Sequence, residues 1–186
     1  MNRKIAISPK NADDHFYFKS FSSVSACGNF DCGITEYNEY LFQDASRSKD
    51  DHIALTWLLT EQATEKVAAY MSLIMDAIKL SFTEKELHNL NYPFKTIPAM
   101  KIAKLAVDSS FSERYRGIGS YMIYAAESRA IGCNDEYCAA RFLTVDADIE
   151  HDTGVLAFYE KNGFIPNSEL YNKNRKTISM RKDIYQ

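Results

Sequence analysis

The sequence has no apolar run of the roughly 20 residues that a membrane-spanning helix requires. Its first residues, MNRKIAISPKNADD, turn polar after a short apolar patch, whereas a secretory signal peptide carries a longer apolar stretch behind its basic residues. These two absences predict a cytoplasmic protein without a membrane partner.

Cysteine and histidine are scarce, with four of each in 186 residues. The cysteines form two pairs with the spacing C-x4-C, Cys27 with Cys32 and Cys133 with Cys138. Structural zinc sites favour shorter spacings within each pair, and the histidines show no ligand spacing. We therefore expect free thiols in a reducing compartment and no metal site.

An excess of positive charge is also lacking, because the net charge is −3 and the pI is near 5.8. This balance disfavours a surface that tracks phosphate backbones, including that of tRNA, although a local basic patch is compatible with it. Basic residues gather near the C-terminus, at Lys173, Arg175, Lys176, Arg181 and Lys182. A tRNA-binding surface is one interpretation of this cluster, and a solvated face is the favoured one.

Apolar residues are plentiful, at 46% of the chain, and their spacing predicts the order of the elements. We expect strands at 16–23, 53–60, 66–76, 100–107, 141–147 and 176–184. One helix is expected from a cap at Thr35 through residue 49, and a short one at 83–90 within an irregular segment, 77–97. A third should run from the loop at 114–120 to about residue 130. The last is expected in VLAFYEKNGF (155–164), where Gly163 stops it. Residues 108–112 are expected to form a polar turn. This order predicts one α+β (α/β-like) domain over residues 1–186, a sheet with helices packed on it.

The segment RYRGIGSYM (114–122) places two glycines where a strand passes into a helix. There the amides of Gly117, Ile118, Gly119 and Ser120 can converge on an anion, because glycine lets the backbone approach closely. Arg114 or Arg116 can add a charge-assisted bond. The same glycines could also be no more than a tight turn into the helix.

Two other phosphate-binding motifs are excluded by the residues around these glycines. A P-loop requires a lysine before Ser120, and a dinucleotide fingerprint requires a third glycine where Met122 stands. What remains is the pattern Arg/Gln-x-x-Gly-x-Gly/Ala, which resembles the first signature of the GNAT acetyltransferase superfamily.

A second segment, AFYEKNGF (157–164), resembles the second GNAT signature on a helix, through Phe158, Tyr159, Lys161, Gly163 and Phe164. The two signatures occur in the expected order and at the expected distance, and the resemblance is strongest over residues 53–182. It implies a single GNAT domain with a mixed, mostly antiparallel central sheet and flanking helices.

The resemblance also implies how acetyl-CoA binds as the co-substrate. The pyrophosphate would be held by the loop from Arg114 to Ser120, and the pantetheine arm by backbone groups of Leu105 and Val107.

Tyr159 stands where the family places the acid that protonates the departing thiolate, and a tyrosine of ordinary pKa, about 10, holds its proton at neutral pH. The alternative is that Tyr159 is an aromatic core residue. For a base, Asp108, Glu113, Asp146 and His151 are near in sequence, and nothing selects one of them.

We therefore expect an N-acetyltransferase that acts by direct transfer on a primary amine of a small molecule or peptide. One alternative comes from the segments NFDCGITEYNEYL and IPAMKIAKLAVD, which are similar to those of toxins that acetylate aminoacyl-tRNA. Another is a CoA-binding module without catalysis. Homodimers are frequent in this superfamily, and the sequence shows no interface.

Overall fold

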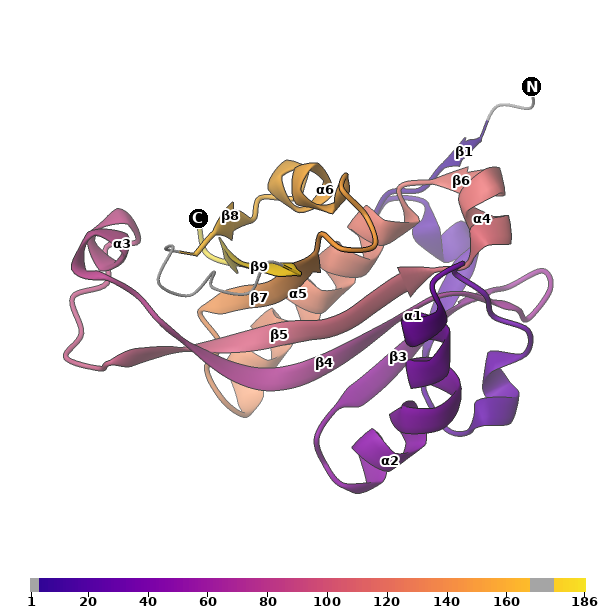
Figure 1. Cartoon of the computed structure of the whole chain (residues 1–186), viewed down its shortest axis with the longest axis horizontal. Coiled ribbons are helices and arrows are strands. Elements are labelled where there is room, and N and C mark those ends of the chain that lie inside the picture. Colours follow the sequence, from indigo (N-terminus) through magenta and orange to yellow (C-terminus); the bar gives the residue numbers. More distant parts are fainter. Residues whose placement is uncertain (1–3, 168–175) are drawn as a thin grey trace. The chain divides into compact units, whose positions relative to one another are not determined.

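The computed structural model describes residues 4–167 and 176–186 (Figure 1). The chain divides into two compact units, Met1–Ile74 with Ala103–Ala125, and Met75–Ile102 with Ala126–Gln186. Three long elements contribute residues to both units: β4 (Val67–Lys79), β5 (Thr96–Val107) and α5 (Ile118–Glu136). A single domain over residues 1–186 stays a prediction.

Seven strands belong to one mixed sheet, and a separate pair is formed by β1 and β6. The order is β2-β3-β4 in the first unit and β5-β7-β9-β8 in the second. Of the described pairings in the large sheet, only β5 with β7 is parallel. The sheet is therefore mostly antiparallel, as predicted. The remaining strands are β1 (Ile5–Ala6), β2 (Phe16–Ser20), β3 (Leu55–Glu61), β6 (Tyr115–Arg116), β7 (Phe142–Asp148), β8 (Ile165–Pro166) and β9 (Thr177–Asp183).

In the first unit, β2, β3 and β4 form an antiparallel meander that buries apolar side chains. Against it packs a helical stretch made of α1 (Thr35–Glu39), a π-helical turn (Tyr40–Asp44) and α2 (Ala45–Asp50). Leu41 and Ala45 are fully buried beside Tyr70. Two short 3₁₀ turns, Ala12–Asp14 and Val24–Cys27, complete the N-terminal segment.

Two local predictions in this unit are corrected by the structure. Thr35 does not cap the helix, because it is the first helical residue and Ile34 stands at the cap. Residues 108–112 are not a polar turn, since α4 (Ser109–Arg114) begins there. The Asp108 carboxylate caps this helix by accepting from the Ser110 amide at 2.9 Å, which is the usual role of aspartate at this position.

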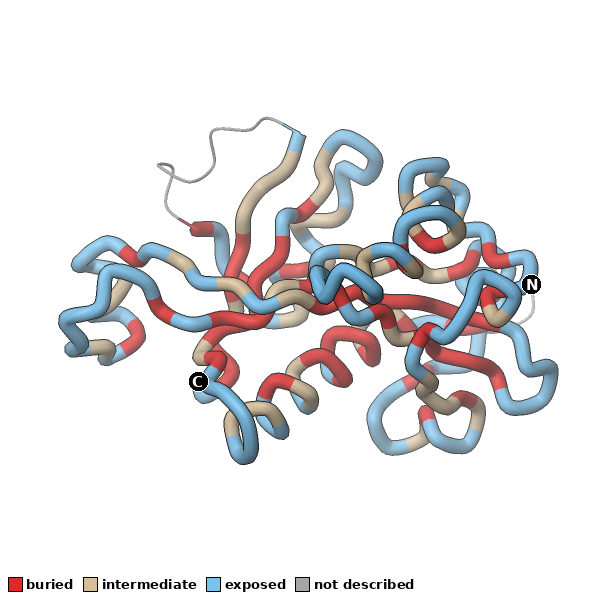
Figure 2. The backbone as a smooth tube through the Cα atoms, turned by 90° about the horizontal axis from the view of Figure 1, so that it is seen from below, coloured by how far each residue is buried: buried red, intermediate tan, exposed pale blue. Residues whose placement is uncertain are grey.

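In the second unit, β7 lies between β5 and β9, and its register with β5 runs from Ala99–Phe142 to Ile102–Val145. The α3 arm, residues 80–95, connects β4 to β5 and contains the predicted short helix as α3 (Phe82–Leu87). Ser81 and Glu84 form a capping box at its start. The last helix is α6 (Val155–Lys161). The long strands and one face of α5 contain most of the buried residues, whereas most connecting loops are exposed (Figure 2).

Three elements extend beyond their predicted bounds. The α5 helix continues to Glu136 instead of ending near Ala130, with Gly132 inside it. β4 continues to Lys79 and β5 already begins at Thr96, so the irregular segment between them is shorter than 77–97. The predicted helix ended too early because the apolar face of α5 ends before the helix itself. Ala130 is buried, whereas residues 131 and 132 are exposed.

Candidate functional site

The glycine-rich junction of the first unit has a structural requirement for one of its glycines. Gly117 adopts φ +91°, and a Cβ there would lie 2.5 Å from the Ile7 carbonyl oxygen. This close approach arises because β1 runs parallel to β6 and the Ile7 amide donates to the Arg116 carbonyl at 2.8 Å. Gly117 is thus needed to pack the N-terminal strand against the junction.

The first turn of α5 follows directly and presents unpaired amides. The Tyr121 amide donates to the Gly117 carbonyl at 2.9 Å, so the amides of Ile118, Gly119 and Ser120 precede the first bond of the helix ladder. Ile118 is only 2% exposed and anchors the start of this 19-residue helix. The arrangement suits an anion, because these N–H groups and the helix dipole favour negative charge.

The two arginines of the junction differ in what they contact. Arg114 forms an ion pair with Glu61 at 3.2 Å, and its guanidinium lies 4.4 Å from the centre of the Phe111 ring. Arg116 is exposed, and its side chain forms no hydrogen bond or ion pair with the residues that the structure describes. Arg114 is therefore held by the fold, and Arg116 is the cation available to a ligand.

The partner of Arg114 was not identified from the sequence. Burial by itself would raise the pKa of the Glu61 carboxyl, but hydrogen bonds from Thr64, Tyr115 and Arg114 outweigh it and lower that pKa. Glu61 thus stays ionised and neutralises the charge of Arg114. The only signal in the sequence is an acidic residue directly after the apolar run of β3, which by itself names no partner.

At the end of β5, side chains alternate between the core and the opposite face. Ala106 is buried with Tyr70, whereas Leu105 and Val107 are half-buried. Both lie beyond the described register of β5 with β7, which ends at Ile102. Their backbone groups remain the predicted partners of a peptide-like ligand arm.

Of the four side chains considered as a general base, three already contact other groups of the protein. Asp108 is buried and accepts from the amides of Ser110 and Asp31. Asp146 pairs with Lys101 at 2.5 Å, and His151 contacts Asp148 at 2.8 Å. Nothing in the structure selects a base.

In the second unit, Tyr159 lies at the end of α6, which closes as a Schellman motif. The Phe164 amide donates to the Tyr159 carbonyl, and the Gly163 amide to that of Glu160, both at 3.0 Å. Gly163 supplies the positive φ of +86° that this ending needs. The Phe164 ring packs edge-on against the Tyr159 ring, with centroids 5.3 Å apart.

This ending explains three residues of the second signature by local structure. Gly163 permits the turn, Phe164 provides its apolar contact, and Tyr159 is fixed between Phe158 and Phe164. Tyr159 is 6% exposed, so the aromatic-core interpretation describes its ring. The role of its hydroxyl is a separate question of chemistry.

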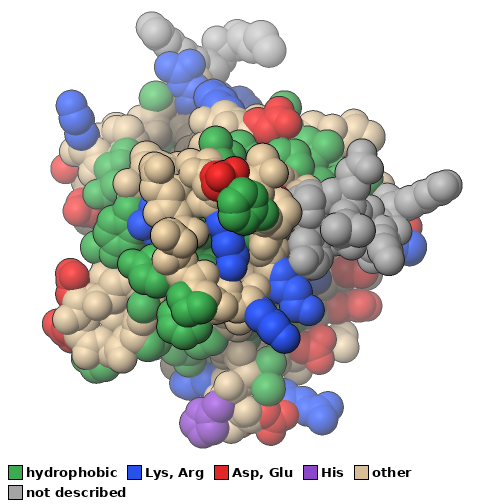
Figure 3. All heavy atoms as spheres, turned by 90° about the vertical axis from the view of Figure 1, so that its left-hand side faces the viewer, with side chains coloured by type: hydrophobic (Ala, Val, Ile, Leu, Met, Phe, Trp, Pro, Cys, Tyr) green, Lys and Arg blue, Asp and Glu red, His purple; other side chains and the backbone are tan. Residues whose placement is uncertain are grey.

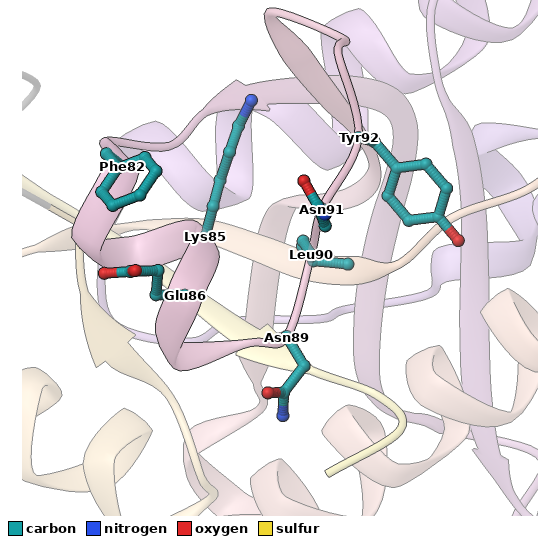
Figure 4. Close-up of a pocket in the computed structure, with 7 residues that line it drawn as sticks. All are labelled: Phe82, Lys85, Glu86, Asn89, Leu90, Asn91 and Tyr92. Atoms are coloured by element: carbon teal, nitrogen blue, oxygen red, sulfur yellow. The ribbon is translucent and has the colours of Figure 1, made fainter.

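The α3 arm contains a cavity of about 630 Å³, lined by Phe82, Lys85, Glu86, Asn89, Leu90, Asn91 and Tyr92 (Figure 4). Tyr92 lines this cavity, and Phe94 stacks on Tyr92 with centroids 6.3 Å apart. The Lys85 ammonium donates to the Phe94 carbonyl at 2.7 Å and ties the helix to the returning loop. Phe82 is 76% exposed, and the molecular face seen in Figure 3 carries several solvent-exposed hydrophobic side chains.

The three described residues of the C-terminal basic cluster, Lys176, Arg181 and Lys182, each pair with a carboxylate. Lys173 and Arg175 lie outside the described residues. Arg181 is 2% exposed and pairs with Glu84 at 2.9 Å. Lys176 pairs with Glu150 and Lys182 with Glu127. Because Arg181 is buried, it belongs neither to a tRNA-binding surface nor to a solvated face.

Within residues 4–167 and 176–186, no group of three or more His, Cys, Asp or Glu residues is arranged to hold a metal ion. Among the helices described, none is long and apolar enough to cross a membrane.

Comparison with solved structures identifies the fold. A tyrosine-to-phenylalanine variant of KacT matches with a TM-score of 0.74 at 17% identity, covering 92% of this chain and 96% of that one. AtaT complexed with acetyl-methionyl-tRNAfMet matches with a TM-score of 0.71 at 20% identity, covering 88% and 93%. KacT and AtaT are GNAT toxin acetyltransferases. The chain has the GNAT fold.

A structure of AtaTR bound with AcCoA shares this GNAT fold with a TM-score of 0.70 at 19% identity, covering 92% of this chain and 95% of that one. Comparison with family models and with curated proteins gave no match. The resemblance found in the two signatures is therefore confirmed at the level of the fold.

Proposed function

We propose that the chain is an acetyl-CoA-dependent N-acetyltransferase that acetylates the amino group of aminoacyl-tRNA, as the toxin of a toxin–antitoxin pair. The observation that supports it most is the fold shared, over nearly the whole of both chains, with AtaT complexed with acetyl-methionyl-tRNAfMet. Other structures of this fold are AtaTR bound with AcCoA and AtaT bound to the C-terminus of the antitoxin AtaR. The toxin alternative is thus better supported than an unspecified amine.

The acidic pI is weak evidence against tRNA, because a polyanion responds to the local charge and not to the sum over the chain. Several lysines and arginines counted in that sum are already paired with carboxylates. A protein antitoxin is the second partner that we propose.

The residues of the first unit fit the anionic part of acetyl-CoA. The amides of Ile118, Gly119 and Ser120 bind the pyrophosphate, and Arg116 adds a charge-assisted bond. Gly117 lets β1 pack against the junction that carries these amides. Arg114 acts indirectly, because its pair with Glu61 fixes the junction on which the loop stands. Backbone groups of Leu105 and Val107 bind the pantetheine arm.

Acetyl-CoA supplies an activated acyl group, and the chain's residues serve the transfer. A C–N bond forms between the amine and the acetyl carbon, and the C–S bond to the thiol breaks. The Tyr159 hydroxyl donates its proton to the departing sulfur, and the attacking amine loses its own proton to solvent. Phe158 and Phe164 hold the donor in place.

The test is acetylation of charged tRNA by the purified protein with radiolabelled acetyl-CoA. We expect label on aminoacyl-tRNA, and none on uncharged tRNA or on aminoacyl-tRNA whose amino group is formylated. Label on small amines or peptides but on no charged tRNA would restore the unspecified-amine function. Acetyl-CoA binding without turnover on any amine would favour the non-catalytic module.

A further inference from the structure

Cys133 and Cys138 face each other where α5 ends, with their sulfur atoms 3.3 Å apart. The amides of Tyr137 and Cys138 both donate to the Cys133 carbonyl, at 2.8 and 3.0 Å. The chain therefore turns tightly after Glu136 and brings Cys138 back over the last helical turn. Cys133 is half-buried, and Cys138 is exposed.

Asn134 holds this turn in place. Its side-chain amide donates to the Ala140 carbonyl at 2.9 Å and to the Tyr185 hydroxyl at 2.7 Å. Its side-chain oxygen accepts from the Ala140 amide. The proximity of the two thiols is thus fixed by backbone and side-chain bonds on both sides of Cys138.

We propose that Cys133 and Cys138 form a redox-active dithiol, which small-molecule disulfides oxidise to an intramolecular disulfide and thiols reduce again. A protein thiolate attacks the small disulfide, forms a mixed disulfide and releases one small thiol. The second cysteine then attacks the mixed disulfide, the Cys133–Cys138 bond forms, and the second small thiol leaves. The pair gives up two electrons and two protons, which the small disulfide takes up. The sulfur atoms need to approach by only about 1.2 Å to reach a bonded distance.

The other cysteine pair has the same C-x4-C spacing and is held differently. Cys27 is 1% exposed, and its thiol points to the Ser23 carbonyl at 3.9 Å. The Cys32 thiol contacts the Asn38 side-chain oxygen at 3.2 Å. Burial raises the pKa of Cys27 to about 11, so it offers almost no thiolate. This pair is a natural control within the chain.

The pKa of Cys138 is also raised, first by its hydrogen bond with Cys133 and then by burial. Because the thiolate is the attacking species, the exchange is slow at neutral pH and accelerates as the pH rises. Exposure of Cys138 gives the reagent access, and closure onto Cys133 is then intramolecular.

The test uses the full chain and peptide mapping after oxidation. Cleavage at Lys and Arg places Cys133 and Cys138 together in residues 130–141, and Cys27 and Cys32 together in residues 20–47. After incubation with oxidised glutathione at mildly alkaline pH, we expect residues 130–141 to lose two hydrogens in mass and to resist alkylation. Residues 20–47 should alkylate twice, and dithiothreitol should restore both thiols of 130–141.

Single variants separate closure from simple adduct formation. Cys133→Ser and Cys138→Ser should each stop at a persistent glutathione adduct on the remaining cysteine. A persistent adduct on 130–141 in the wild type, two unreacted thiols there, or equal loss of thiols from 20–47 would overturn the proposal.

Discussion

Tyr159 combines two properties that a sequence pattern cannot separate. Its ring is part of the packing at the end of α6, between Phe158 and Phe164. Its hydroxyl is the proposed proton donor, and packing of the ring does not depend on that group. Replacing only the hydroxyl therefore tests the chemistry without removing the ring contacts.

We predict that Tyr159→Phe lowers kcat for acetyl transfer by about 10²- to 10⁴-fold, the usual contribution of a general acid. The melting temperature and acetyl-CoA binding should change little, because the phenylalanine ring keeps the contacts of the tyrosine ring. Thiol release from acetyl-CoA, followed with the acceptor identified by labelling, gives the rate. Tyr137→Phe is the matched control, since Tyr137 is 81% exposed. Equal rates for Tyr159→Phe and wild type would exclude Tyr159 as the acid.

The different roles of Arg114 and Arg116 could not be predicted from the sequence. Arg114 and Arg116 stand two positions apart in RYRGIGS, and from the sequence either one could supply a cation to an anionic ligand. Only the fold brings Glu61, 53 positions away from Arg114, into contact with it. A long-range ion pair of this kind leaves no local periodicity, so the sequence could not distinguish a structural arginine from an available one.

At the scale of the element, the Schellman ending of α6 is the part of the candidate site that the sequence predicts best. Gly163 was expected to stop the helix, and the structure confirms it with φ +86°. Glycine at this position is required by backbone geometry alone, so the prediction needed no tertiary information.

We predict that Gly163→Ala destabilises the protein by about 1–2 kcal/mol, the cost of a left-handed conformation for a residue with a Cβ. The added Cβ would also lie 3.4 Å from the Lys182 side chain. Gly132→Ala is the matched control, because it lies inside α5 with nothing within 4 Å of the new Cβ. It should stabilise by about 0.5–1 kcal/mol. Urea unfolding measures both, and an unchanged midpoint for Gly163→Ala would contradict the proposed role of this ending.

Strands and helices whose apolar residues recur with a clear periodicity were predicted well, but the positions of their ends were predicted poorly. The strands at 53–60 and 66–76 and the helix that follows the loop at 114–120 are present as expected. The helix α4 was missed because its sequence, SSFSER, contains one buried residue, Phe111. It forms because the Asp108 carboxylate caps it and accepts from the Asp31 amide at 2.9 Å, and this second contact is tertiary.

At the scale of the whole molecule, the order of the predicted elements and the two signatures predicted the fold class, whereas net charge was a poor guide to partners. The sum of −3 counts charges that the fold has already paired, such as Arg181 with the Glu84 carboxylate. The charge that a ligand meets depends on which cations stay unpaired, as Arg116 does among the described residues. The sequence shows how many charges there are, and the fold decides which are free.

The most direct test of the central claim, that the start of α5 binds the pyrophosphate of coenzyme A, is thermal denaturation with acetyl-CoA. A ligand that binds the native state stabilises it by about 2.7 kcal/mol at 100 times its Kd, so the melting temperature should rise with concentration. Acetylpantetheine, which lacks the pyrophosphate, should give a much smaller rise. Arg116→Ala should weaken the effect of acetyl-CoA, and Arg47→Ala, which removes an exposed arginine side chain of the same unit, should not. No shift at millimolar acetyl-CoA, or equal shifts with acetylpantetheine, would contradict this account.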